Sequence, residues 1–364
     1  MAGKHTAQHT AQPERYPRKT VRARRPVWLL AIYDILLTGA VLCVFALFHH
    51  VIPRMNAANM EPPKPTSVVS RTAEPTAQPE SGADAESTPE PTVEVIDTRT
   101  EWQKKFAEHF TDEIVSTDNT YTSPDVSITI STITVGEGGY SSQCHIADIY
   151  IARIENFQTY FATGSYGYYA SESALGIDRD SGALISINGD YCNNQTSGFL
   201  VRNGELYFSE QTSNDICVLY RDGTMATFGP GEYNVDEQLT KEPWQVWKFG
   251  PKLLDADGVP MTEFNTTSEI KWENPRSGVG YYEPGHYCFV VVDGRQNGYS
   301  RGLTMDEFAQ LFADLGCKAA YNLDGGASAV MTFNDAEYSR PSNGGRDLGD
   351  VLLIKEIDKS EGEN

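Results

Sequence analysis

A strand–helix–strand segment near the C-terminus constrains the fold of this chain more than any other feature. Residues 287–292 are apolar without interruption, which is typical of a buried strand. Thr304 and Glu307 then form a capping box, the usual start of a helix, and apolar positions repeat with helical spacing up to Gly316. A second strand is predicted at 317–323. This order predicts a crossover unit with two parallel strands.

Polar residues follow each of these strands. Asp293 comes after the first strand and Asp324 after the second, and Asn188 and Asp190 follow a third predicted strand at 183–187. Parallel neighbours lie about 4.8 Å apart, and ligands bind outside the carboxyl ends of such strands. We therefore expect Asp293 and Asp324 to lie side by side at a ligand site. A simple tight turn is the alternative for each Asp-Gly pair taken alone.

The remaining pattern predicts a domain rich in β-strands. Hairpins are expected at Asn203-Gly204 and Asp222-Gly223, because such pairs favour two-residue turns. Strands are expected at 126–135 and 146–154, and apolar residues every four positions predict a helix over 102–114. The predicted class is mixed α/β (α+β), with a large mixed β-sheet core and the crossover near the C-terminus.

The chain divides into four regions by composition. Residues 1–25 carry seven basic residues and one acidic residue, and an apolar run follows. Because about 20 apolar residues cross a bilayer, we expect a cytoplasmic tail at 1–25 and a transmembrane signal anchor at 26–53. The Pro- and Thr-rich stretch 54–98 is predicted to be a disordered linker. The domain at 99–364 would then lie outside the cell.

This organisation predicts a single-pass type II protein of the cell membrane, with the lipid bilayer as a partner. A cleavable signal peptide is the alternative, but the apolar run is longer than such peptides need.

Charge excludes one class of partner. After residue 54 the chain has 48 acidic and 21 basic residues. Nucleic-acid binding is therefore excluded, because neutralising a phosphate backbone needs a basic surface.

Five cysteines lie beyond the apolar run, with no Cys-x-x-Cys spacing that would indicate zinc. A Cys192–Cys217 disulfide and free buried thiols are both open alternatives.

Several short motifs together resemble the phosphodiester glycosidase family, whose members include N-acetylglucosamine-1-phosphodiester alpha-N-acetylglucosaminidase. The motifs occur in the family's order within about residues 120–357, and the anchor and linker look like those of exported Gram-positive members. One position departs from the usual Asp-Gly-Gly-Gly-Ser pattern, since Ala327 replaces the third glycine. The matching motifs are Ile187-Asn188-Gly189-Asp190-Tyr191, residues 247–253, residues 274–277, Val292-Asp293-Gly294-Arg295, residues 322–328 and residues 341–346.

The resemblance implies hydrolysis of a sugar C1–O bond whose other side is a phosphate. A carboxylate is needed at C1, for which Asp324 is the first candidate and Asp293 and Asp190 the second. Positive charge or backbone N–H groups are needed for the phosphate. The residues expected to bind substrate are Asn188, Gly189, Arg276, Arg295, Asn322, Gly325, Gly326, Ser328 and Arg346.

The sequence therefore predicts an extracytoplasmic hydrolase of sugar-1-phosphodiesters, such as N-acetylglucosamine-1-phosphate linkages, in a cell-surface polysaccharide or teichoic-acid-like polymer. A non-catalytic glycan-binding or envelope-assembly module is the alternative. The chemistry requires no cofactor, although an Asp-rich rim also suits Ca²⁺ or Mg²⁺.

Overall fold

A computed structural model describes residues 27–46, 63–68 and 97–357 of the 364-residue chain. By its contacts the chain divides into two units, residues 1–56 and 57–364, which are described separately here. The first unit contributes helix α1, Val27–Ala46. The predicted cytoplasmic tail at 1–25 and most of the predicted linker at 54–98 lie outside the described residues.

The membrane prediction is corrected. Among the helices in the described residues, none combines the length and the apolar character that crossing a bilayer requires. The expected signal anchor at 26–53, the bilayer as a partner and the type II membrane location are therefore not supported.

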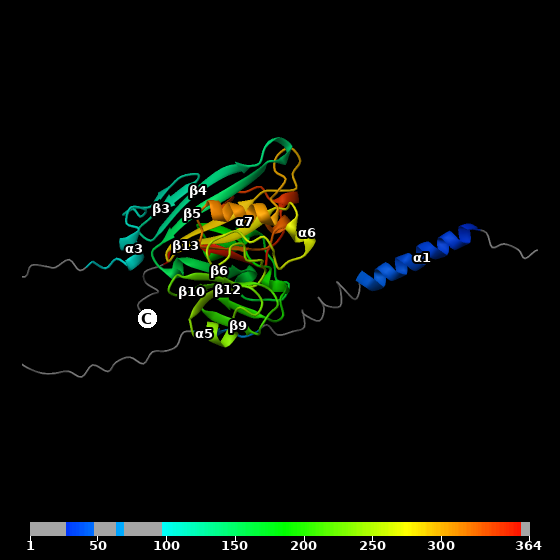
Figure 1. Ribbon diagram of the computed structural model, residues 1–364, viewed down its shortest axis with the longest axis horizontal. Helices are drawn as coiled ribbons and strands as arrows, with labels where there is room; N and C mark the ends of the chain where they lie inside the picture. Colours follow the sequence, from blue (N-terminus) through cyan, green and yellow to red (C-terminus); the bar gives the residue numbers. More distant parts are fainter. Residues whose placement is uncertain (1–26, 47–62, 69–96, 358–364) are drawn as a thin grey trace, which may run out of the picture. The chain divides into compact units, whose positions relative to one another are not determined.

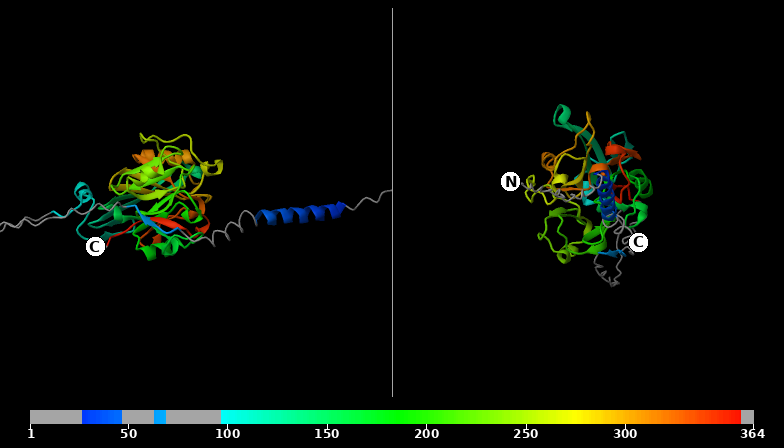
Figure 2. Two further views of the ribbon diagram at one scale, coloured as in Figure 1. Left: turned by 90° about the horizontal axis from the view of Figure 1, so that it is seen from below. Right: turned by 90° about the vertical axis from the view of Figure 1, so that its right-hand side faces the viewer.

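Three antiparallel sheets make up the second unit (Figures 1 and 2). The seven-stranded sheet has the order β15-β13-β14-β5-β4-β3-β2, the five-stranded sheet β17-β16-β7-β18-β6, and the six-stranded sheet β1-β9-β8-β12-β10-β11. The strands of the first sheet are β2 Val115–Ser116, β3 Thr120–Thr122, β4 Val126–Val135, β5 Ser142–Ile151, β13 Arg276–Glu283, β14 His286–Val292 and β15 Ala319–Asn322.

The five-stranded sheet comprises β6 Phe157–Phe161, β7 Ile185–Asn188, β16 Met331–Phe333, β17 Ala336–Glu337 and β18 Asp350–Ile354. The six-stranded sheet comprises β1 Thr66–Ser67, β8 Phe199–Arg202, β9 Glu205–Ser209, β10 Ile216–Tyr220, β11 Met225–Phe228 and β12 Pro243–Trp247. Its edge strand β1 comes from the segment predicted as linker and pairs with β9.

Helices in the described part of the second unit are few and short. They are α3 Glu101–Lys105, α4 Ala174–Ser181, α5 Val235–Leu239, α6 Ser268–Lys271 and α7 Met305–Asp314. Single 3₁₀ turns are η2 Gly138–Tyr140, η3 Ile154–Asn156, η4 Ala162–Gly164, η5 Cys192–Asn194, η6 Gly326–Ser328 and η7 Ser342–Gly344. The helix expected over 102–114 is wrong beyond α3, because the chain turns at Phe106 and Ile114 is 64% exposed just before β2.

The predicted mixed sheet is also corrected, because every strand pair in the described residues is antiparallel and the unit is mostly β. Strands β14 and β15 are parallel to each other, as the crossover predicted, but they are not neighbours. Strand β13 lies between them and pairs antiparallel with both. Asp293 and Asp324 therefore follow strands two positions apart.

The sequence of strand β14 is almost continuously apolar because both faces of the strand are buried. Phe289 and Val291 face the main core, which collects side chains from all three sheets. Val290 and Val292 face a second core beneath α7. Helix α7 begins with the predicted capping box at Thr304 and lies against the outer face of the seven-stranded sheet (Figure 1).

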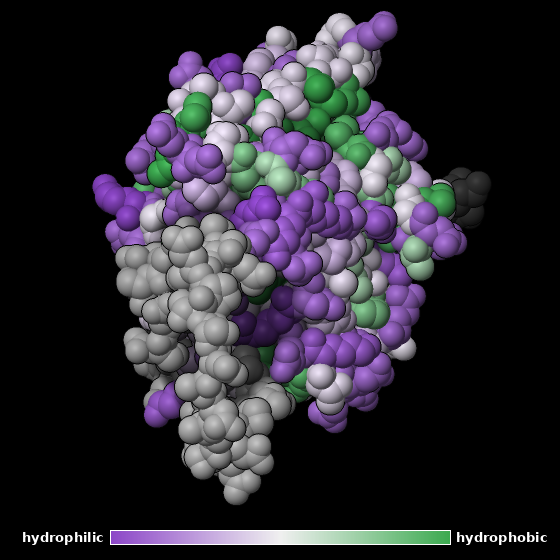
Figure 3. All heavy atoms as spheres, turned by 90° about the vertical axis from the view of Figure 1, so that its left-hand side faces the viewer, coloured by the Kyte–Doolittle hydropathy of each residue, from purple (hydrophilic) through white to green (hydrophobic). Residues whose placement is uncertain are grey.

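Both hairpin predictions are confirmed. Asn203 and Gly204 join β8 to β9 and both have positive φ, +52° and +76°. Asp222 and Gly223 join β10 to β11. The face of the molecule in Figure 3 is mostly hydrophilic, with smaller apolar patches.

The cysteines in the described residues are all free, so the Cys192–Cys217 alternative is wrong and both thiols are buried. The Sγ atoms of Cys288 and Cys317 lie 3.7 Å apart.

Candidate active site

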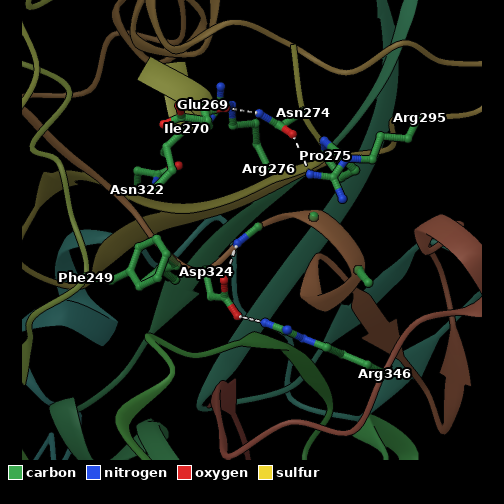
Figure 4. Close-up of a pocket in the computed structure, with 14 residues that line it drawn as sticks. Phe249, Glu269, Ile270, Asn274, Pro275, Arg276, Arg295, Asn322, Asp324 and Arg346 are labelled. Carbon is green, nitrogen blue, oxygen red and sulfur yellow. Dashed lines mark hydrogen bonds and ion pairs between the residues drawn. The ribbon is translucent and has the colours of Figure 1, made fainter. Parts of the chain in front are cut away.

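A cavity of about 350 Å³ opens where loops from several strands meet (Figure 4). Seven of the twelve predicted site residues line it: Arg276, Arg295, Asn322, Asp324, Gly325, Gly326 and Arg346. The other lining residues are Phe249, Glu269, Ile270, Asn274, Pro275, Leu323 and Ala327. We call this cavity the arginine pocket.

The carboxylate of Asp324 is held by three hydrogen-bond donors at the wall of the arginine pocket. Its Oδ2 accepts hydrogen bonds from Ser328 Oγ at 2.6 Å and from Arg346 Nη2 at 2.5 Å. Its Oδ1 accepts the N–H of Gly325 at 2.9 Å. The side chain is 14% exposed. These three donors hold the carboxylate in one orientation at the pocket wall.

The backbone of Asp324 is fixed from beneath by Asn188. Asn188 Nδ2 donates to the Asp324 carbonyl at 2.7 Å, and the Asp324 N–H reaches the Gly189 carbonyl at 3.3 Å. Asn188 Oδ1 accepts from Ser277 Oγ at 2.5 Å. Asn188 is buried and does not line the arginine pocket. Asn188 therefore holds the backbone of Asp324 in place, and its expected role in substrate binding stays a prediction.

The two glycines after Asp324 serve the turn itself. A Cβ on Gly325 would lie 2.7 Å from the Pro275 carbonyl oxygen, so the backbone approach there requires glycine. Gly326 has φ +65°, and its N–H donates to the same carbonyl at 3.1 Å. Both N–H groups that were expected to bind phosphate are thus already paired within the protein.

Gly189 allows the Asp350 carboxylate to lie close to the backbone, since a Cβ on residue 189 would be 2.2 Å from that carboxylate. The hydroxyl of Ser328 already has two partners, because it donates to Asp324 and accepts from Arg346 Nε at 2.5 Å. Gly189 and Ser328 lie on the small crevice beside Asp324, outside the arginine pocket.

Three arginines line the arginine pocket, Arg295 and Arg346 from loops and Arg276 from the first position of β13. Arg346 has a 45% exposed side chain and pairs with Asp324. Arg295 Nη2 donates to Asn274 Oδ1 at 2.7 Å, and its backbone has φ +58°, an uncommon conformation that clusters at functional sites. Asp324 and Glu269 are the lining carboxylates, so the lining is net positive within an acidic domain.

The third arginine, Arg276, is buried. Its Nε donates to the Leu303 carbonyl at 2.9 Å and its Nη2 to the Trp272 carbonyl at 2.5 Å. Burial lowers its pKa to about 10, while Glu307 opposes and Arg295 reinforces that shift. At neutral pH the guanidinium stays charged. It ties the loop before β13 in place and adds positive charge behind the pocket wall.

Asn322 leaves one polar atom unsatisfied. Its Nδ2 donates to the Gly250 carbonyl at 2.7 Å, whereas its Oδ1 is buried without a hydrogen-bond partner in the described part of the chain. Because Asn322 lines the arginine pocket, an N–H or O–H donor there, from a ligand or from an ordered water, would satisfy this acceptor.

The structure places Asp190 in a buried ion-pair network beside the arginine pocket. Its Oδ1 lies 2.7 Å from Arg202 Nη2, and its Oδ2 accepts the N–H of Lys248 at 2.7 Å. The same guanidinium contacts Asp350 at 3.2 Å. Burial, then the charge of Asp190, raise the pKa of Asp350 to about 7.

Asp190, Cys192 and Asp350 also form the one cluster in the described residues with metal-ligand spacing. Arg202 already supplies positive charge to both carboxylates, and this disfavours a cation there. The expectation of Ca²⁺ or Mg²⁺ stays a prediction.

The structure places Asp293 in a separate network, outside the lining of the arginine pocket. Its Oδ2 contacts His145 Nε2 at 3.0 Å and accepts from Tyr299 at 2.8 Å. Its Oδ1 accepts the N–H of Arg340 at 2.9 Å. Asp293 is 2% exposed, so these contacts replace solvent around its charge.

Seven lining residues were not among the predicted site residues. Three of them, Pro275, Leu323 and Ala327, lie directly beside predicted residues in the sequence. The other four are Phe249, Glu269, Ile270 and Asn274. Phe249 and Asn274 did lie within the motifs shared with the family, which was the available signal. Glu269 and Ile270 lie on α6, and nothing local in the sequence marks them.

Comparison with known proteins shows which family this part of the chain matches. Residues 181–355 match the family model described as phosphodiester glycosidase, and all twelve predicted site residues fall inside that range. Residues 181–355 are a phosphodiester glycosidase domain.

Two known proteins show how far the similarity extends. An uncharacterised SPbeta prophage-derived protein of Bacillus subtilis, YomE, is 29% identical over 201 residues, which are 53% of this chain and 31% of that protein. The match thus spans about a third of the relative's length. The zebrafish N-acetylglucosamine-1-phosphodiester alpha-N-acetylglucosaminidase catalytic domain, in a structure auto-inhibited by its pro-peptide, has a TM-score of 0.53 at 22% identity. That likeness covers 67% of this chain and 88% of the zebrafish chain, and it concerns the fold.

Proposed function

We propose that this domain hydrolyses the C1–O bond of a sugar-1-phosphodiester within a phosphodiester-linked glycan. The observation that carries the proposal is the position of Asp324. Its carboxylate is oriented by three donors at the wall of a cavity whose lining also includes three arginines. A carboxylate for C1 and positive charge for a phosphate are therefore available in one pocket.

The leaving group decides which catalytic groups are needed. When the C1–O bond breaks, its electron pair leaves with a phosphate monoester, which is already a stable anion. Protonation by a general acid, which an alcohol leaving group requires, is then unnecessary. Positive charge around the phosphate stabilises the charge that leaves, and arginine suits phosphate because its planar donors bind two oxygens together.

Asp324 would stabilise the positive charge that develops at C1. Water would add its hydroxyl group to that carbon and lose its remaining proton to the solvent. Arg346 contacts Asp324 directly, and 45% of its side chain is exposed. It is therefore the arginine best placed to contact both the carboxylate and a phosphate beside it. Arg295, on the opposite loop, would bind phosphate from the other side, and the free Oδ1 of Asn322 would accept a hydrogen bond from the sugar.

The test is Asp324→Asn, assayed with N-acetylglucosamine 1-(methyl phosphate). This change keeps the shape of the side chain and removes its charge. Loss of one preorganised group that stabilises charge in the transition state costs about 10²–10³-fold in rate, and we expect a fall in kcat in that range. Asp257→Asn is the matched control, because Asp257 is exposed in a surface turn and does not line the pocket.

Turnover that survives Asp324→Asn undiminished would remove the catalytic assignment. If the unmodified protein binds the diester but never cleaves it, the domain is a glycan-binding module instead.

A further inference from the structure

A second cavity, of about 330 Å³, adjoins the arginine pocket. Phe249 lines both cavities. Tyr191 lines the second one, and Arg346 lies over its ring, with Cζ 5.3 Å from the ring centroid. Phe249 and the Tyr191–Arg346 pair therefore separate two adjoining spaces. We call the second one the amide pocket.

The lining of the amide pocket differs in chemistry from that of the arginine pocket. It presents side-chain amides, one hydroxyl, two aromatic rings, one amine and the paired carboxylate of Asp190. Amides both donate and accept, and aromatic rings cover apolar C–H faces, so this set suits a neutral polyhydroxylated group. The lining residues are Asp190, Tyr191, Asn194, Gln195, Thr196, Asn214, Lys248 and Phe249.

The charged groups of the amide pocket are already engaged. Lys248 Nζ donates to the Ser197 carbonyl at 2.6 Å, and Asp190 is paired with Arg202. The amide pocket is thus poorly suited to a second phosphate, whereas the arginine pocket has the cations for one.

Two further features support a ligand site at the amide pocket. Gln195 Nε2 donates to the Asp190 carbonyl at 3.2 Å, but its Oε1 is buried without a hydrogen-bond partner among the described residues. Tyr191 has φ +60°, a conformation that a bulky side chain adopts rarely and that clusters at functional sites. The strained backbone places its 37% exposed ring at the boundary of the two pockets.

We propose that the amide pocket binds the group esterified to the far side of the phosphate, and that this group is a sugar or polyol. The inference rests on the proposed function, because it takes the cleaved glycosyl unit to occupy the arginine pocket. A phosphate held by Arg346 would lie next to Tyr191, so its second ester would extend over that ring into the amide pocket. The substrate then spans at least two units of a glycan.

The experiment compares two substrates that differ only in this group: N-acetylglucosamine 1-(methyl phosphate) and N-acetylglucosamine 1-(glycerol phosphate). We expect kcat/KM to be higher for the glycerol ester. Asn214 Nδ2 makes only a long 3.4 Å contact to the Lys248 carbonyl, so it is free to turn towards a hydroxyl. Asn214→Ala should lower the glycerol-to-methyl ratio of kcat/KM about fivefold, the usual effect of one neutral hydrogen bond.

Gln310→Ala is the matched control, because Gln310 is an exposed amide on α7 away from both pockets, and it should leave the ratio unchanged. Equal kcat/KM for the two esters in the unmodified protein, or an unchanged ratio in Asn214→Ala, would overturn the inference.

A binding measurement separates this inference from the proposed function. Glycerol phosphate and methyl phosphate are titrated into the unmodified protein and into Asn214→Ala by calorimetry. If neither diester is cleaved but glycerol phosphate binds more tightly and Asn214→Ala removes that difference, the amide pocket stands and the hydrolase proposal fails. If both diesters are cleaved without any preference in rate or binding, the proposed hydrolysis is supported and the amide pocket does not bind part of the substrate.

Discussion

Replacing Arg346 with methionine separates catalysis from stability. Arg346 makes two hydrogen bonds, from Nη2 to Asp324 and from Nε to Ser328, and its side chain is 45% exposed. An ion pair this exposed contributes at most about 1 kcal/mol to folding. Arg346→Met should therefore lower the melting temperature by only a few degrees, since 1 kcal/mol corresponds to about 2–4 °C in a domain of this size.

The effect on turnover should be much larger. A hydrogen bond to a charged group contributes about 1.5–3 kcal/mol, which corresponds to roughly 10–150-fold in rate. We expect kcat/KM for the methyl phosphate diester to fall within that range, because both the phosphate and the orientation of Asp324 lose a partner. Arg346→Lys should recover part of the loss, since it restores the charge but not the paired donors.

The measurement combines steady-state kinetics with a thermal melt of each variant. The reasoning is refuted if Arg346→Met changes kcat/KM by less than about threefold while the protein stays folded. The reasoning is also refuted if the fraction of activity lost in Arg346→Met equals the fraction of protein that is unfolded.

Three further predictions concern the turn, the buried acid and metals. Gly325→Ala should destabilise the domain by about 1–3 kcal/mol and reduce turnover, because its Cβ would lie 2.7 Å from the Pro275 carbonyl oxygen; Gly139→Ala, with open space around it, is the control in the same melts and assays. The pKa of Asp350 is raised to about 7, so its contribution to stability is full below about pH 4 and is lost as pH rises to 7. Denaturant titrations should show that Asp350→Asn loses less stability than the unmodified protein between pH 5 and pH 8, and an equal loss would contradict this assignment. Turnover should be unaffected by EDTA, because arginines supply the positive charge at the phosphate, and an activity restored only by added Ca²⁺ or Mg²⁺ would show that a metal is needed.

Local elements of the fold could be predicted because their causes are local. The capping box at Thr304 starts α7, and Asn203-Gly204 adopts the positive φ angles of a two-residue hairpin. The predicted class was wrong in the arrangement of the sheet. Strand β13 precedes β14 in the chain yet inserts between β14 and β15, and no local signal marks such a pairing.

The candidate site was predictable to the extent that its residues adjoin one another in the sequence. The turn from Asn322 to Ser328 brings Asp324 and its Ser328 partner together by chain connectivity. The partners contributed by other loops required the fold, since Arg346, Asn274 and Phe249 meet Asp324 only where several strands end together.

The sequence by itself determined the motif that carries Asp324, the turn that exposes it and the family to which residues 181–355 belong. Only the tertiary structure decided which carboxylate faces the pocket. Asp190 and Asp324 both follow a strand in the sequence, but Asp190 is buried against Arg202, whereas Asp324 lies at the wall of the arginine pocket. The physical reason is that a charge removed from water needs an opposite charge nearby, and the chain position of an aspartate does not reveal where that partner will lie.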